Sequence, residues 1–271
     1  MICKNAESKF KSGFLLPFRG WGLNLHFIMQ KQLVIFQDLG LLDYQVAWDY
    51  QEKLLKGNVE MKSAVFNLST HEYELRTDDS QLSTQNYLLF VEHPPVYTLG
   101  KSGNENNVLI DEQEREEKGI QYFRTNRGGD ITFHGKGQIV CYPIIDLEKF
   151  YTDIGKYLRN LEEVVILTLS DYGIVGGRSA GETGVWIDAD KKGMERKICA
   201  IGVRTSRWIT MHGFALNVNT DLSYFNNIIP CGIQNKQVTS IEKELNRKID
   251  FEEAKERVKI NFAKVFNVEI V

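Results

Sequence analysis

The second half of the chain contains a succession of short strand-like segments with no helix-like segment between them. These are residues 184–189, 197–203, 207–211 and 214–219, with a hairpin tip expected at residues 190–195. Consecutive strands joined by tight turns pair in antiparallel fashion, whereas a doubly wound parallel sheet needs a crossover between strands. The succession therefore favours a largely antiparallel sheet.

Helix-like segments lie on both sides of this succession. Residues 44–55 carry apolar side chains at roughly helical spacing. Asp153 is placed to cap a longer helix. The expected inward face of that helix comprises Ile154, Tyr157, Leu158, Leu161, Val164, Val165 and Thr168. The other expected helix starts are Thr239 or Ser240, for a short helix, and Asp250, for a last helix that runs through Phe266.

Further strands are expected at residues 32–37, 86–93, 96–100 and 138–147. Pro94 and Pro95 separate two of them, and a double proline marks a strand end or a tight edge because it cannot sit in a central ladder. Helices and strands are thus mixed along the chain. This order predicts an α+β fold with a largely antiparallel or mixed central sheet flanked by helices.

Two segments do not fit this pattern. Residues 57–82 are polar, and we expect them to form an excursion on the surface. Near the N-terminus, Pro17, Arg19 and Asn24 interrupt an apolar run, and no small-residue cleavage site follows it. We interpret residues 1–28 as a disordered or artefactual extension and residues 29–271 as a single domain.

Composition narrows the class of function. The formal net charge of −3 does not suggest a nucleic-acid partner. The four cysteines (Cys3, Cys141, Cys199 and Cys231) are scattered, without a CxxC pair or zinc-type spacing, so neither a metal site nor a disulfide framework is expected. No apolar run reaches the ~18 residues of a membrane span. We therefore expect a cytoplasmic protein.

The segment from Lys197 to Gly232 carries the strongest candidate chemistry. Lys197 begins an apolar strand, and Cys231 lies in a Pro-Cys-Gly corner that suits the edge of a pocket better than a packed core. A nearby ammonium favours the thiolate, which is the reactive form of cysteine. Our hypothesis is that Lys197 and Cys231 meet in space as a nucleophilic pair.

Ordinary structural roles compete with this hypothesis. A free cysteine is most often a small buried hydrophobe, and a strand lysine often faces solvent at a sheet edge. Cys141 and Cys199 lie within apolar strands and are expected in the core. His93 or His212 offers an alternative partner for Cys231. Neither histidine lies in a protease signature, so we rank that arrangement lower.

A second constellation is the sequence RGGDITFHG at residues 127–135. Glycines that interrupt a strand often mark close approach of the backbone to a ligand. The segment lacks the features of a Walker loop and of a dinucleotide fingerprint, so it does not indicate a nucleotide phosphate. We expect it to form one wall of a pocket for an extended ligand.

Several motifs together resemble a known family. EHPPVYTLG, RGGDITFHGKGQ, GVW, KICAIGVR, HGFALNVN and PCG occur in this order, over about residues 33–245. They resemble the octanoyltransferases of lipoate biosynthesis, which transfer octanoyl from acyl carrier protein to lipoyl domains. The resemblance implies a fold like that of the biotin and lipoate protein ligases. It also implies a cofactor-free acyl-enzyme mechanism in which Cys231 carries the octanoyl group and Lys197 tunes it.

The resemblance also implies a set of substrate-binding residues. They are Arg127, Gly128, Gly129, Asp130, Ile131, Thr132, Phe133, His134, Ala200, Ile201, Gly202, Gly213, Phe214 and Ala215. The implied donor is octanoyl-acyl carrier protein, and the implied acceptors are the lipoyl domains of 2-oxoacid dehydrogenases and the H protein of glycine cleavage. A monomer is expected. The candidates for a docking patch for acidic partners are Lys101, Arg124, Lys136, Arg204 and Arg207.

Three other functions stay open at this point. One is an ATP-dependent lipoate or biotin protein ligase on the same scaffold, which would not need Cys231. Another is an amidotransferase that moves octanoyl between lipoyl domains through a cysteine. The third is a non-catalytic binder of carrier or lipoyl domains, whose function would survive replacement of Cys231.

Overall fold

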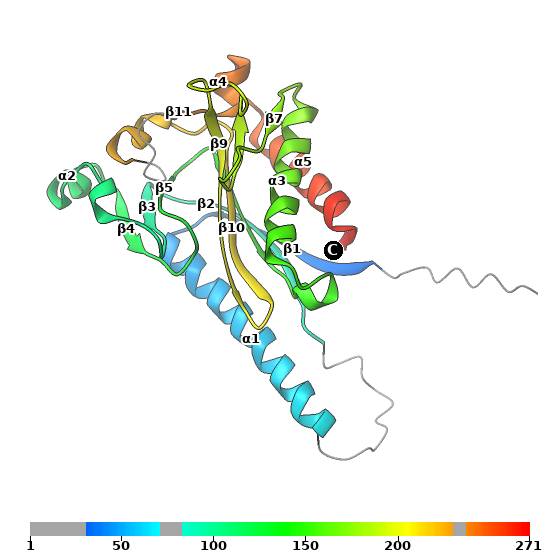
Figure 1. Cartoon of the computed structure of the whole chain (residues 1–271). Coiled ribbons are helices and arrows are strands. Elements are labelled where there is room, and N and C mark those ends of the chain that lie inside the picture. The colour runs from blue at the N-terminus through cyan, green and yellow to red at the C-terminus, as the bar shows by residue number, and fades with distance from the viewer. Residues whose placement is uncertain (1–30, 71–82, 230–236) are drawn as a thin grey trace, which may run out of the picture. The chain divides into compact units, whose positions relative to one another are not determined.

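A mixed sheet of nine strands is the central element of the computed structural model (Figure 1). The structure describes residues 31–70, 83–229 and 237–271, and the side chains of residues 66–70 are not described. Its order is β12-β1-β2-β6-β10-β9-β8-β7, with β11 paired to β9. The strands are β1 (Gln32–Leu41), β2 (Asn86–Glu92), β6 (Gln138–Ile144), β7 (Gly176–Gly177), β8 (Val185–Ile187), β9 (Arg196–Ser206), β10 (Ile209–Asn217), β11 (Gln237–Val238) and β12 (Val268–Ile270).

Both pairing modes occur in this sheet. β1 pairs in parallel with β2 and β12, and β11 pairs in parallel with β9. The pairs from β2 through β6, β10, β9 and β8 to β7 are antiparallel. The predicted α+β fold with a largely antiparallel or mixed sheet is therefore confirmed.

A second sheet is small and has the order β4-β3-β5. It consists of β3 (Val96–Leu99), β4 (Gln121–Arg124) and β5 (Ile131–His134). Pro94 and Pro95 fall between β2 and β3, where the chain passes from the large sheet to the small one. The expected break is confirmed. The helix α2 (Glu112–Glu117) and the short 3-10 helices η2 (Glu105–Asn107) and η4 (Leu222–Asn227) accompany this sheet.

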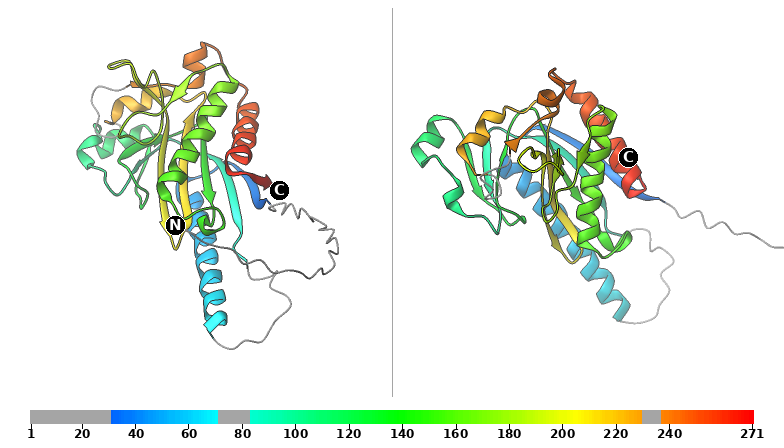
Figure 2. Two further views of the ribbon diagram at one scale, coloured as in Figure 1. Left: turned by 45° about the vertical axis from the view of Figure 1, so that its right-hand side comes forward. Right: turned by 45° about the horizontal axis from the view of Figure 1, so that its top comes forward.

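Helices cover both faces of the large sheet (Figures 1 and 2). α3 (Ile154–Asp171) and α5 (Phe251–Phe266) pack together on one face, where they share the main hydrophobic core with β6, β9 and β10. α1 (Tyr44–Thr70) lies on the other face against β6 and β10. The caps expected at Asp153, at Ser240 for α4 (Ile241–Leu245) and at Asp250 are all present.

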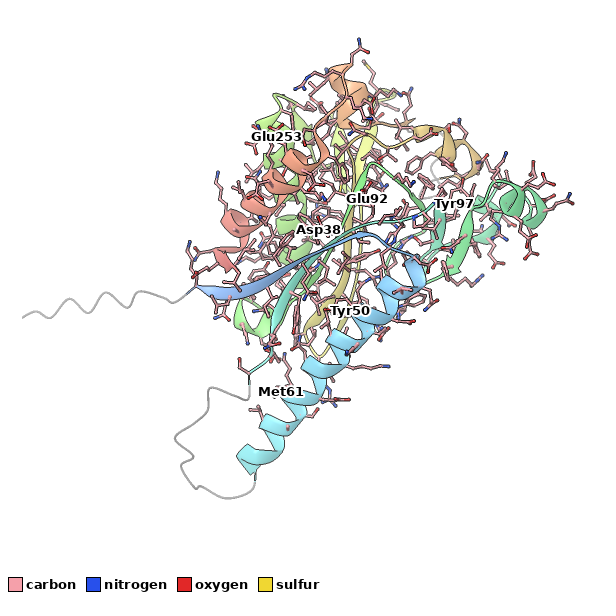
Figure 3. All side chains as sticks on the ribbon, turned by 180° about the vertical axis from the view of Figure 1, so that it is seen from behind. Asp38, Tyr50, Met61, Glu92, Tyr97 and Glu253 are labelled. Carbon is pink, nitrogen blue, oxygen red and sulfur yellow. The ribbon has the colours of Figure 1, made fainter. Side chains whose placement is uncertain are left out.

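The expected surface excursion at residues 57–82 was wrong for its first half. Residues 57–70 continue α1 as one long helix, along which Tyr50 and Met61 are labelled in Figure 3. Polar contacts hold this part of the helix. Asn58 exchanges two hydrogen bonds with the backbone of Gln85, at 2.8 and 2.9 Å, and Lys62 lies 2.5 Å from Asp146. Residues 71–82 lie outside the described residues.

β10 also differs from expectation, because one strand replaces the two predicted at residues 207–211 and 214–219. Arg207 and Trp208 form the two-residue turn from β9, both with positive φ, as a type I′ hairpin turn requires. The expected hairpin tip at residues 190–195 lies between the antiparallel strands β8 and β9, as predicted. Within the described ranges, no helix is both long and apolar enough to cross a bilayer. The extension expected at residues 1–28 lies outside those ranges.

Candidate active site

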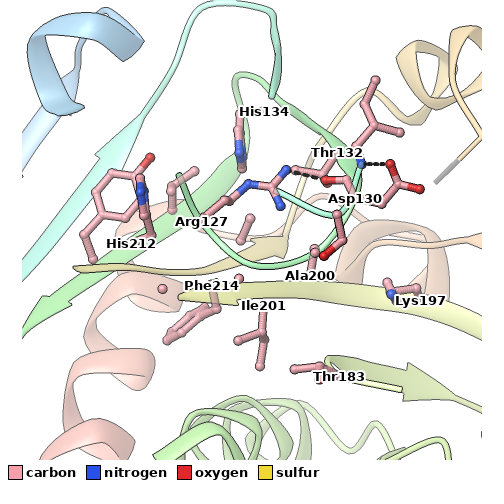
Figure 4. A pocket seen from close by; sticks show the side chains of 18 of the residues that line it. Arg127, Asp130, Thr132, His134, Thr183, Lys197, Ala200, Ile201, His212 and Phe214 are labelled. Carbon is pink, nitrogen blue, oxygen red and sulfur yellow. Dashed lines mark hydrogen bonds between the residues drawn. The ribbon is translucent and has the colours of Figure 1, made fainter. Parts of the chain in front are cut away.

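A cavity of about 400 Å³ lies between the β9–β10 hairpin and the segment 127–134 (Figure 4). Lys197 and His212 stand at opposite ends of it, with Arg127 and Ala200 between them. His212 pairs with Val203, six residues along β9 from Lys197. At about 3.3 Å per strand residue, the two ends are about 20 Å apart.

Most of the residues implied by the resemblance line this cavity. They are Arg127, Gly129, Asp130, Ile131, Thr132, His134, Lys197, Ala200, Ile201, Gly202, Gly213, Phe214 and Ala215. Phe133 lies elsewhere, because alternation along β5 directs it into the core of the small sheet, where it stacks on Tyr224 with ring centres 4.6 Å apart. Gly128 also lies off the lining, and its N–H donates to Val203 O at 3.0 Å.

The guanidinium of Arg127 braces its own loop. Nη2 donates to Thr98 O at 2.6 Å, to Thr98 Oγ1 at 3.0 Å and to Asp130 O at 2.8 Å, while Nη1 donates to Gly128 O at 3.0 Å. The planar fork of arginine suits such a fixed set of acceptors. The residue is 8% exposed. Its four hydrogen bonds fix the shape of the cavity wall.

The loop at residues 127–130 joins the two sheets. Gly100 N donates to Asp130 O at 3.2 Å on the side of the small sheet, and Gly128 N donates to Val203 on the side of the large sheet. The contact with β9 requires glycine at position 202, because a Cβ there would lie 2.7 Å from Gly128 O. The glycines at 128 and 129 were expected to allow close approach of the backbone to a ligand. In the structure, Gly128 allows the loop to approach β9.

Lys197 is 9% exposed and borders both the main cavity and a small pocket formed with Asn217, Phe225 and Val238. Val238 of β11 pairs with it in parallel. Cys231 lies outside the described residues. The nearest described points on either side of it are Ile229, whose N–H donates to Asn107 O at 2.8 Å, and Gln237, which pairs with Arg196.

Two buried histidines hold fixed hydrogen bonds near the cavity. His134 Nδ1 donates to Gln138 Oε1 at 2.8 Å, since the Gln138 amide nitrogen is directed to Asn217 and Phe133 O. His93 Nδ1 donates to Leu42 O at 2.7 Å, and its Nε2 accepts from the Tyr142 hydroxyl at 2.9 Å. Burial lowers the pKa of His93 to about 4 and holds that of His134 well below its ordinary value. Both rings are therefore neutral at pH 7.

A third buried histidine, His212, closes the far end of the cavity. Its Nε2 donates to Asn126 Oδ1 at 2.7 Å, and the amide of Asn126 is oriented by its bond to Glu52 at 3.1 Å. Burial lowers the pKa of His212 to about 3. The neutral ring is about 20 Å from Lys197 and therefore forms part of the cavity wall at the opposite end.

The remaining cysteines of the described chain are core residues. Cys141 and Cys199 are fully buried, and burial raises the pKa of each thiol well above its ordinary value. Neither can ionise readily, so the expectation that both are structural is confirmed. Among the described residues, no group of three or more His, Cys, Asp or Glu side chains is arranged to hold a metal ion.

Sequence reasoning missed part of the lining. The additional residues are Tyr44, Ser102, Val140, Tyr142, Glu182, Thr183 and His212. Period-two alternation could have placed Val140 and Tyr142 on one face of β6. Glu182 and Thr183 come from the connection between β7 and β8, which has no periodic pattern.

The cations proposed as a docking patch do not share one surface position. Arg124 pairs with Glu105 at 2.7 Å, and Arg204 pairs with Glu52 at 2.6 Å. Arg207 lies in the β9–β10 turn, ten residues along the hairpin from Lys197. Lys101 and Lys136 are exposed. Four of the five candidates, all except Arg204, are thus exposed cations, and their docking role stays a prediction.

Comparisons with known proteins give close relatives in sequence. The chain matches the lipoyl protein ligase A/B catalytic domain over residues 43–263. It is 54% identical to the octanoyltransferase of Christiangramia forsetii over 89% of this chain and 99% of that one. It is 54% identical to the octanoyltransferase of Flavobacterium johnsoniae, over 90% and 100%, and 46% identical to that of Bacteroides fragilis, over 83% and 94%.

Solved structures with the same fold are more distant in sequence. A lipoate-protein ligase A bound with ATP superposes with a TM-score of 0.63 at 15% identity, over 90% of this chain and 88% of that one. A lipoate protein ligase from Thermoplasma acidophilum gives 0.58 at 16% identity, over 90% and 86%. The implied fold of the lipoate protein ligases is therefore confirmed.

Proposed function

The chain belongs to the octanoyltransferases, within the lipoyl protein ligase A/B catalytic-domain family, and from this membership we propose that it works through a thioester on Cys231. It is an acyltransferase of protein lipoylation. The proposed donor is octanoyl-acyl carrier protein. The proposed acceptor is a lysine of a lipoyl domain, in 2-oxoacid dehydrogenases and in the H protein of glycine cleavage.

The position of Lys197 at one end of the cavity is the observation that supports this proposal most. Cys231 precedes Val238, the backbone partner of Lys197, by seven residues, and at most about 3.5 Å per residue this length of chain can bring the thiol to the amine. An ammonium within about 4–6 Å favours the thiolate. The pair would then supply the nucleophile for acyl transfer.

The cavity suits an acyl chain of the proposed length. An extended octanoyl group, with seven carbon–carbon bonds of about 1.5 Å, is about 9 Å long. Starting near Lys197, it would run along residues 200–202 of β9, under the loop braced by Arg127. The wall there is mostly glycine, alanine and isoleucine, which do not bind water strongly.

The proposed reaction has two steps that balance without a cofactor. The Cys231 thiolate attacks the thioester carbonyl of the donor, a carbon–sulfur bond forms, and the carrier thiolate leaves and takes up a proton, for which Lys197 is the proposed source. The amine of the acceptor lysine then attacks the acyl-enzyme, an amide forms as the carbon–sulfur bond breaks, the Cys231 thiolate is released, and Lys197 takes up the proton that the amine loses. ATP is unnecessary because a thioester is already activated. Backbone N–H groups of the glycine-rich segments are the proposed donors to the oxyanion.

A transfer assay tests this proposal. The purified chain is mixed with a lipoyl domain and one of three donors: octanoyl-acyl carrier protein without ATP, an octanoylated lipoyl domain without ATP, or free octanoate with ATP. We expect transfer to be fastest from the carrier-bound donor, no product from octanoate with ATP, and no product from Cys231→Ala. Product from octanoate and ATP would instead identify a ligase. Faster transfer from an octanoylated lipoyl domain than from the carrier would identify an amidotransferase.

Three further expectations accompany this function and stay predictions. Residues 29–271 are proposed to act as a single catalytic domain. The protein is proposed to work in the cytoplasm and as a monomer. Sedimentation of the full chain tests the last of these.

A further inference from the structure

We propose that Trp186 is a positioning residue for Lys197. The indole face of Trp186 holds the ammonium of Lys197 at the end of the cavity where acyl transfer is proposed to take place. The inference rests on the proposed function, because it assigns Lys197 the role of an activating cation. It adds a residue to which neither the sequence motifs nor the cavity lining gave a role.

The geometry of the two side chains carries this inference. Lys197 Nζ lies 4.5 Å from the centre of the Trp186 ring, and the tryptophan is 2% exposed. Trp186 and Lys197 are direct cross-strand partners in the β8–β9 pair. A cation this close to a tryptophan face is attracted by the ring quadrupole, and more strongly when water is excluded.

The backbone around the pair fixes this arrangement. The register of β8 and β9 shifts between Val185 and Trp186, so β9 carries an extra residue beside the lysine, and such bulges re-aim side chains. Gly184, with φ of +121°, lies against the lysine stem, where a Cβ would be 3.5 Å from Lys197 Cε. Its N–H donates to Oε1 of the buried Glu162 at 3.1 Å. Trp186 thus lies at the ammonium of Lys197 and Gly184 lies beside its Cε.

An indole face serves an activating lysine in a way that a carboxylate does not. It stabilises the protonated amine against the cost of burial, and it adds no negative charge beside a thiolate. A carboxylate in the same place would repel the thiolate electrostatically. Trp186 therefore favours the charge state of Lys197 that lowers the pKa of a neighbouring thiol.

The test measures the pH dependence of Cys231 alkylation in the full chain. Iodoacetamide is added over a pH series, and modification of the Cys231 peptide is followed by mass spectrometry. We expect the half-ionisation pH of wild type below the ordinary value of about 8.5. Trp186→Leu should raise it by about one pH unit, Trp186→Phe by less because a weaker face remains, and the control Trp208→Leu should not change it.

A double-mutant cycle separates positioning from a general loss of packing. In the background of Lys197→Met, Trp186→Leu should have no further effect on the alkylation profile, because the cation on which the ring acts is gone. Equal effects in both backgrounds, or an unchanged profile in folded Trp186→Leu or Trp186→Phe, would overturn the inference. If Lys197→Met itself leaves the alkylation profile unchanged, Lys197 does not activate Cys231. That result would contradict both the role of Lys197 in the proposed function and the role of Trp186 inferred from it.

Discussion

Val238 lies opposite Lys197 in parallel register, and Thr239 N donates to Lys197 O at 3.0 Å. The chain that follows the Pro-Cys-Gly corner therefore returns to the strand that carries the lysine. Two residues that stand 34 positions apart in sequence, Lys197 and Cys231, are linked by this pairing through a short length of chain. The pairing of β11 with β9 thus allows Cys231, the proposed nucleophile, to reach Lys197, the proposed activating residue.

Replacement of Arg127 by lysine should weaken both the fold and the activity. Lysine keeps the charge but cannot satisfy the carbonyl oxygens of Thr98, Gly128 and Asp130 together, so we expect a loss of about 3 kcal/mol in unfolding free energy. Urea unfolding measures the loss. Arg124→Lys is the control, because its pair with Glu105 is exposed and should change stability by less than about 1 kcal/mol. Equal effects of the two substitutions would contradict the bracing role.

Gly202→Ala should slow octanoyl transfer at least tenfold. The new Cβ would lie 2.7 Å from Gly128 O and would push the loop at residues 127–130 away from β9, which changes the cavity wall. The stability cost should be about 1–3 kcal/mol. Gly57→Ala, in an open position of α1, should instead stabilise the protein by about 0.5–1 kcal/mol without affecting transfer. Normal kinetics in Gly202→Ala would show that the loop contact is unimportant.

Stability should fall as the pH drops from 7 to 5. Burial lowers the pKa of His93 to about 4 and that of His212 to about 3, whereas unfolded histidine titrates near 6.5. In this window the unfolded chain takes up protons that the folded chain does not. Each histidine therefore contributes stability above about pH 6.5 and loses up to about 2 kcal/mol of it by pH 5. Urea unfolding at constant ionic strength should show the decrease, and equal stability at pH 7 and 5 would refute it.

Lys62→Met should destabilise the protein without slowing catalysis. Lys62 Nζ lies 2.5 Å from the buried carboxylate of Asp146 and donates to Arg207 O at 2.9 Å, so its loss leaves a buried charge uncompensated. We expect a cost of about 3 kcal/mol. Transfer kinetics at low temperature should match wild type, because this contact lies at the hairpin turn, far from Lys197. The exposed Lys56→Met serves as the control.

The elements with strong local signals could be predicted from the sequence. Caps at Asp153 and Asp250 were identifiable because an acidic side chain preceded an apolar helical period, and the double proline marked the passage between sheets. The wall at residues 127–134 was foreseeable because its glycines allow close backbone approach. Each of these features depends on neighbouring residues in the chain.

Features that depend on distant residues could not be predicted. The second half of α1 is polar and is held by Gln85 and Asp146, which its own sequence does not reveal. The place of His212 at the end of the cavity depends on the pairing of β9 with β10, and its neutrality depends on burial. The face of Trp186 beneath Lys197 likewise follows from the shifted register of β8 and β9.

Intact-mass spectrometry after mixing with octanoyl-acyl carrier protein, without an acceptor, tests the central claim most directly. The account predicts an adduct of one octanoyl group that hydroxylamine removes, that is absent in Cys231→Ser and that forms more slowly in Lys197→Ala. Persistence of a hydroxylamine-labile adduct in Cys231→Ser, or unimpaired transfer to a lipoyl domain by that variant, would contradict it.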